Sequence, residues 1–196
     1  MRARLAHVEY GSDMRTAPAF LAGLLVALTL VACVPDDEPV RPEPSPTASP
    51  IFASDEEALA AAEAAYGAYV VVSDTISSQG GAGADALMDL VSANYYAQIE
   101  KEYAEFALTG GRTSGFTSFD SMTLQQRNSD DGVEVIVTYA CLDVSGVRVL
   151  DASGIDVTPQ GRLTRLPLEI TFEASDSTDL IVAGSEVWDG ADYCDA

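Results

Sequence analysis

The stretch Val133–Val144 (VEVIVTYACLDV) decides the fold that this sequence can adopt. It is rich in β-branched residues, and apolar side chains occupy both alternating sets of positions, as in strands covered on both faces. We therefore expect it to be the central strand of a sheet. The segment Leu166–Glu173 alternates apolar and polar residues over its whole length, which predicts a second, half-buried strand.

Shorter strands are expected around this pair. The alternating pattern predicts further strand segments at Met122–Gln125, Val147–Leu150, Ile155–Val157 and Leu180–Trp188. The turn Asp130-Asp131-Gly132 leads into the central strand, and Asp151-Ala152-Ser153-Gly154 joins two of the short segments as a hairpin.

The residues before these strands have a helical period. Ser54-Asp55-Glu56-Glu57 is a capping box, which starts a first helix that runs to about Ile76. A short second helix is expected over 85–91, and a third over 93–109. Helices followed by antiparallel strands indicate the α+β class, with N-terminal helices packed on a curved antiparallel sheet.

A segment near the N-terminus predicts where the protein works. Leu30-Val31-Ala32-Cys33 ends the apolar run Phe20–Ala32 and resembles the lipobox of bacterial lipoproteins. The resemblance implies cleavage between Ala32 and Cys33, and lipidation of Cys33. The protein would then be anchored in the lipid bilayer, on the extracytoplasmic face of the cell membrane. The alternative is an uncleaved membrane helix, although the run is short for a hydrocarbon core of ~30 Å.

These features divide the chain into three parts. Residues 1–32 are the predicted lipoprotein signal peptide; we favour Met14 as its true start, since Glu9 and Asp13 are unusual in such a signal. Residues 33–53 are a predicted disordered tether, because six prolines and four acidic residues between 34 and 50 favour an extended spacer. This spacer is either glycosylated on its serines and threonine or unmodified. Residues 54–196 form the predicted α+β domain.

The chain is strongly acidic, with 31 aspartate and glutamate residues against 10 lysines and arginines. Such a chain repels nucleic acid phosphates, so we expect no nucleic acid partner. The single histidine, His7, lies in the predicted signal peptide. A processed chain without histidine excludes Ser-His-Asp and Cys-His catalysis and ordinary zinc ligation.

The cysteine count fits the lipobox interpretation. If Cys33 of the three cysteines carries lipid, Cys141 and Cys194 remain as a pair. An oxidising setting outside the cytoplasm favours a disulfide between them, which would close a loop of about 54 residues and stabilise the fold by about 4 kcal/mol. Two free buried thiols are the alternative.

Three segments together resemble a known family. Residues 64–81 (AAYGAYVVVSDTISSQGG), 85–96 (DALMDLVSANYY) and the GGRTSG at 110–115, followed by the strands, are similar to NTF2-like (SnoaL-like, cystatin-like) cone domains. They are similar in particular to small secreted lipoproteins of actinobacteria. The resemblance implies a cavity between the helices and the sheet. Its possible lining residues are Tyr66, Tyr69, Tyr95 and Tyr103.

Three functions remain open at this stage. The sequence favours a non-enzymatic domain that binds a small ligand or another envelope protein, with no cofactor. The second hypothesis is a cavity enzyme of the isomerase or dehydratase type, in which a tyrosine acts with Asp74, Asp120 or Asp143; no acid matches a family motif, so we assign no catalytic residue. The third is a structural module that forms a homodimer through its sheet.

Charged clusters add no further site. The acidic groups around Asp151 and Asp189 lack the oxygen pattern and terminal glutamate of a calcium loop, so we expect no metal. Arg148, Arg162 and Arg165 are expected to pair with the acids around them, the alternative being a partner contact.

Overall fold

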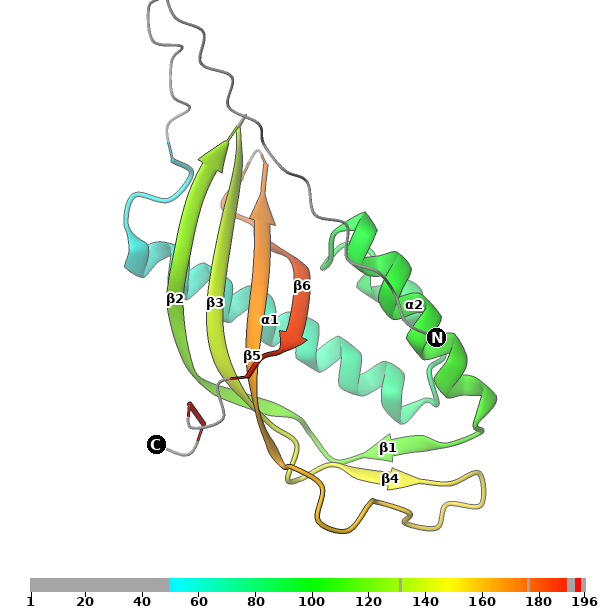
Figure 1. The fold of residues 1–196 in the computed structure, drawn as a ribbon. Coiled ribbons are helices and arrows are strands. Elements are labelled where there is room, and N and C mark those ends of the chain that lie inside the picture. The colour runs from blue at the N-terminus through cyan, green and yellow to red at the C-terminus, as the bar shows by residue number, and fades with distance from the viewer. Residues whose placement is uncertain (1–49, 131, 176, 190–192, 195–196) are drawn as a thin grey trace, which may run out of the picture. The chain divides into compact units, whose positions relative to one another are not determined.

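A four-stranded antiparallel sheet with the order β2-β3-β5-β6 forms the centre of the domain (Figure 1). Its strands are β2 (Ser118–Asp130), β3 (Val133–Asp143), β5 (Arg165–Ala174) and β6 (Ile181–Val187). A separate two-stranded sheet pairs β1 (Arg112–Ser114) with β4 (Arg148–Leu150). The computed structural model describes residues 50–130, 132–175, 177–189 and 193–194.

The predicted signal peptide, the lipobox Leu30–Cys33 and the predicted tether up to residue 49 lie outside the described residues. None of the helices formed by the described residues has the length and apolar character needed to cross a membrane.

Two α-helices and one short 3₁₀ helix precede all the strands of the described residues, so the predicted α+β class is confirmed. The elements are α1 (Asp55–Ser78), the 3₁₀ helix η1 (Ala84–Leu87) and α2 (Ala93–Leu108). Figure 1 shows α1 crossing one face of the sheet, with α2 on the side of β6. Four of the five side chains that α1 buries recur every fourth residue, namely Ala58, Ala62, Tyr66 and Val70; the fifth is Ile76. The alanines are fully buried, and their small side chains let the helix lie close to the sheet.

The central position predicted for the strand at 133–144 is confirmed, because β3 pairs with β2 on one side and β5 on the other. On the face toward α1, Glu134, Ile136, Thr138 and Ala140 are all 0% exposed. On the other face, the valines of β3 are half-buried, and Trp188 stacks on Tyr139 with ring centroids 4.2 Å apart. The predicted disulfide between Cys141 and Cys194 is present, with a Cα–Cα distance of 5.5 Å.

Three sequence expectations need correction, and one short strand was not expected. The strand expected at Met122–Gln125 is only part of the longer strand β2. Two β-bulges in β2 interrupt the alternation of apolar and polar residues, so the sequence pattern reveals only this part. The helix expected over 85–91 is only the 3₁₀ turn η1, after which Val91 forms a parallel bridge with Val182. Residues 155–157 contribute a single bridge, between Asp156 and Leu150, because β4 pairs mainly with β1. The short strand β1 itself was not predicted.

The packed chain begins before Ser54, the expected start of the domain. The Ser54 hydroxyl accepts the Glu57 N–H as predicted, but the Glu57 carboxylate accepts the N–H of Ala53 rather than that of Ser54. Phe52 is only 2% exposed and belongs to the core. The residues directly before the helix cap are therefore part of the folded domain.

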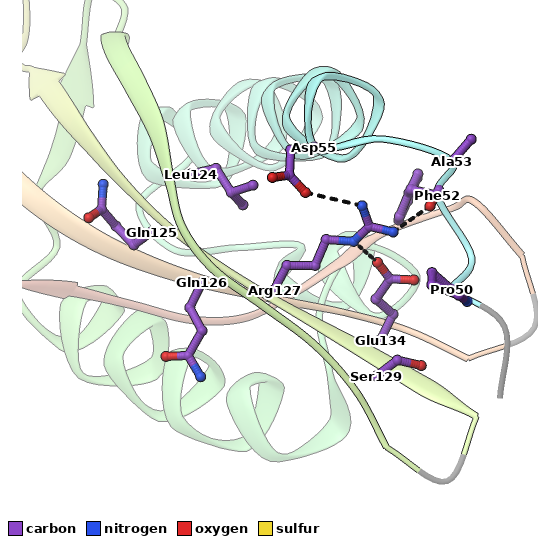
Figure 2. A pocket seen from close by; sticks show the side chains of 10 residues that line it. All are labelled: Pro50, Phe52, Ala53, Asp55, Leu124, Gln125, Gln126, Arg127, Ser129 and Glu134. Carbon is purple, nitrogen blue, oxygen red and sulfur yellow. Dashed lines mark hydrogen bonds and ion pairs between the residues drawn. The ribbon is translucent and has the colours of Figure 1, made fainter. Parts of the chain in front are cut away.

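A buried ion pair holds this entry segment against the sheet (Figure 2). Glu134 on β3 is fully buried, and its carboxylate accepts the Ile51 N–H at 2.5 Å and the Nε–H of Arg127. The Arg127 guanidinium also donates to the Phe52 carbonyl and lies 3.3 Å from the Asp55 carboxylate. We call Ile51, Phe52, Asp55, Arg127 and Glu134 the entry clamp. Within it, Glu134 and Arg127 each have a charged partner and a hydrogen bond to the backbone.

We expect Arg127→Met to lower the free energy of unfolding by about 3 kcal/mol, because it leaves the Glu134 carboxylate buried without a counter-charge. The double variant Arg127→Met/Glu134→Met should regain much of that loss, since no lone charge remains buried. Urea denaturation measures both variants. Arg148→Met is the control: its ion pair with Asp156 is more than half exposed, so stability should hardly change. A double variant less stable than the single one would contradict this account.

Candidate functional site

The cleft that most of the predicted tyrosines line lies between the C-terminal half of α1, α2 and the ends of the central strands. It has a volume of about 300 Å³. Hydroxyl-bearing side chains and aliphatic side chains line it together. The residues are Tyr66, Tyr69, Val70, Ser73, Asp74, Ser77, Tyr95, Thr117, Leu142, Val144, Leu168, Ser185 and Val187. We call it the tyrosine cleft.

Helical spacing brings the tyrosines together. Tyr66 and Tyr69 are three residues apart on α1, so they share one face of that helix, and their rings stack with centroids 5.7 Å apart. The Tyr69 and Tyr95 hydroxyl oxygens are 3.2 Å apart, which joins α1 to α2. The Tyr66 hydroxyl lies 3.3 Å from the Ser185 hydroxyl on β6. The cleft wall thus contains three tyrosine rings from two helices, with one hydrogen bond from α1 to α2 and one from α1 to β6.

Three of the four tyrosines expected in a cavity line this cleft, and the fourth lines a neighbouring one. Tyr103 faces a hollow of about 270 Å³ together with Glu102, Phe106 and Thr113. Tyr69 and Ser77 line both hollows, so the two adjoin along α1.

Burial keeps the phenols protonated. It raises the pKa of Tyr66, Tyr95 and Tyr103 above the ordinary value of 10.0, because ionisation would leave a charge in a poorly hydrated site. For Tyr95, the neighbouring Tyr69 adds to this upward pKa shift. These hydroxyls therefore remain hydrogen-bond donors and acceptors at physiological pH.

Only one of the three acids considered at the sequence level belongs to the tyrosine cleft. Asp74 lines it, and its two carboxylate oxygens accept the N–H and the hydroxyl of Thr117, each at 2.7 Å. Asp120 and Asp143 instead pair with Arg165, at 2.9 Å and 3.6 Å. The Arg165 hydrogen bond is the main cause that lowers the pKa of Asp120. The hypothesis of a tyrosine acting with a carboxylate is thereby narrowed to Asp74.

Arg148, Arg162 and Arg165 all bind acceptor groups of the domain itself. Arg165 pairs with two carboxylates, as expected, and Arg148 lies 3.8 Å from Asp156. Arg162 differs from expectation, because it donates to the backbone carbonyls of Val144 and Val147 rather than to an acid. Among the described residues, no group of three or more histidine, cysteine or acidic side chains is placed to hold a metal ion.

Two features of these sites do not follow from the sequence pattern. Ser185 reaches the tyrosine cleft because a register shift between β5 and β6 places both Val182 and Ser185 opposite core residues of β5. The entry clamp depends on a bulge in β2 that turns Arg127 toward the core. One signal was available for the clamp: Glu134 is an isolated charge in an apolar strand, with Arg127 just across the turn.

The raised tyrosine pKa values predict a loss of stability in alkali. Below pH 10 both the folded and the unfolded chain keep these phenols neutral; above it the unfolded chain ionises first, so the free energy of unfolding should fall as pH rises. Tyr66→Phe/Tyr95→Phe should flatten this dependence. Urea denaturation between about pH 8 and 11 measures it. An equally steep fall in the double variant would contradict the assignment.

No protein-family model matches this chain, and no curated protein is similar to it. Among solved structures, it is similar to the intermembrane space region of the chloroplast protein ARC6, with a TM-score of 0.48 and 8% sequence identity. The match covers 66% of this chain and 95% of that one. A likeness this distant assigns neither a family nor a function to the chain.

Proposed function

We propose that this chain is a lipid-anchored protein of the extracytoplasmic membrane face whose domain binds a small uncharged ligand in the tyrosine cleft. The observation that carries the binding function is the cleft itself, in which protonated tyrosine hydroxyls stand beside aliphatic walls. Binding sites of small molecules commonly combine such apolar walls with a few polar groups that orient the ligand. The lipobox-like Leu30–Cys33 carries the location.

The lining also selects the ligand class. No lysine or arginine is among the lining residues, and Asp74 contributes a carboxylate. An anion would therefore meet a negative charge without a counter-charge, whereas a neutral ring with a carbonyl oxygen could accept a hydrogen bond from a phenol. We infer an apolar, uncharged ligand with at least one hydrogen-bond acceptor.

Binding without catalysis is favoured by the state of Asp74. Both oxygens of Asp74 already accept hydrogen bonds from Thr117. These two contacts hold the turn at Thr117 against α1, which gives Asp74 a structural role that requires no catalysis.

The finer fold is part of the proposal. A long helix across one face of a curved sheet, with a cleft beside the helix, agrees with the NTF2-like cone suggested by the sequence. The disulfide between Cys141 and Cys194 agrees with a protein that functions outside the cytoplasm.

Ligand binding can be tested with matched small probes, namely cyclohexanone and phenol against cyclohexanecarboxylate and benzoate. Saturation-transfer NMR should detect binding of the two neutral compounds and not of the two anions. Ser185→Phe should abolish it by filling the cleft, while Ser153→Phe, in an exposed turn, should preserve it. Neutral probes that do not bind, or that bind Ser185→Phe equally well, would contradict the proposed site.

The anchor is tested separately. Cys33→Ala should block processing of the precursor and release the protein from lipid attachment, because the acylated sulfur is lost. Membrane fractionation together with mass spectrometry of the N-terminus measures both effects. A Cys33→Ala chain that is processed normally and stays with the membrane would rule out the lipobox interpretation.

A further inference from the structure

Phe116, in the turn between β1 and β2, is 85% exposed. Across from it on α1, Val71 is 66% exposed. Between them lies a groove of about 360 Å³, lined by Val71, Asp74, Thr75, Ser78, Gly115, Phe116 and Thr117. The groove shares Asp74 and Thr117 with the tyrosine cleft, whereas Phe116 and Val71 line the groove and not the cleft.

The backbone on both sides of Phe116 is fixed. Gly115 has a φ of +92°, and a Cβ at this position would lie 2.1 Å from the Gly146 carbonyl oxygen, so the turn is packed against the neighbouring loop. On the other side, Thr117 donates two hydrogen bonds of 2.7 Å to Asp74. The ring is thus exposed while its main chain is held. Such an arrangement lowers the ordering cost when an aromatic side chain binds a partner.

The charge of the domain indicates what could approach this ring. The chain carries a net charge of −21, and none of the groove's lining residues is basic. Of the six described basic residues, the arginines at 127, 148, 162 and 165 have acceptors within the domain, and Lys101 lies 3.9 Å from Glu105; Arg112, on β1, is exposed. A second copy or an anionic bilayer would be repelled, whereas a positively charged surface would be attracted.

We propose that the Phe116 groove docks a basic protein segment that presents an apolar side chain to Phe116 and Val71. The side chain would enter the groove between α1 and the turn, and the positive charges around it would face the acidic domain. This is an interaction surface in addition to the tyrosine cleft, so the two can be tested independently.

A random 12-residue peptide library, selected on the full-length protein in detergent and counter-selected on Phe116→Ser, tests the proposal. Peptides enriched on the wild-type protein should carry net positive charge and at least one large apolar residue. Their affinity, measured by fluorescence anisotropy, should fall about tenfold in Phe116→Ser and in Val71→Ser. Leu163→Ser, which alters a 74% exposed leucine on the connection between β4 and β5, should leave it unchanged.

Three results would overturn the proposal. The first is a selection in which no peptide distinguishes the wild-type protein from Phe116→Ser. The second is enrichment of neutral or acidic peptides. The third is self-association of the Cys33→Ala chain in ultracentrifugation, or its sedimentation with phosphatidylcholine vesicles, if the added Phe116→Ser change abolishes it. The groove would then bind a second copy of the chain in the first case and the membrane in the second.

Discussion

The buried ion pair between Arg127 and Glu134 is the contact on which one end of the domain depends. A fully buried carboxylate is tolerated only when a counter-charge and hydrogen-bond donors replace water. Glu134 obtains these from Arg127 and from the Ile51 N–H. Arg127 in turn binds the Phe52 carbonyl. The requirements of the buried Glu134 carboxylate and of its partly buried partner Arg127 therefore fix where the chain enters the domain and where α1 can begin.

The helix α1 then crosses the sheet, and three hollows lie beside its second half. The tyrosine cleft, the hollow beside Tyr103 and the Phe116 groove all use residues of the last three turns of α1. Asp74 and Thr117 stand between the first and the last of them. One end of the domain holds the Arg127–Glu134 ion pair in the wall of a polar hollow of about 460 Å³, and the other end carries the tyrosine cleft and the two hollows beside it.

The described tail residues, Tyr193 and Cys194, pack on the face of the sheet that points away from α1. Three contacts hold the described tail residues near β3. They are the Cys141–Cys194 disulfide, a hydrogen bond of 2.6 Å from the Tyr193 hydroxyl to the Ser121 carbonyl, and one of 3.2 Å from Arg165 to the Cys194 carbonyl. Ser121 has a φ of +56° and lies at a bulge of β2, which aims its carbonyl at the tail. This cover explains why the strand at 133–144 is apolar on both faces.

The sequence by itself determined the α+β class, the central strand, the cap and length of α1 and the cysteine pair. Each rests on a local period, a cap or a count that needs no distant partner. Tertiary structure alone decided which polar residues meet. Arg127 is three residues after the core residue Leu124, and Ser185 is three after Val182, so strict alternation assigns each to the wrong face. Bulges and register shifts reverse both assignments, and these arise from pairing between strands, which no single segment encodes.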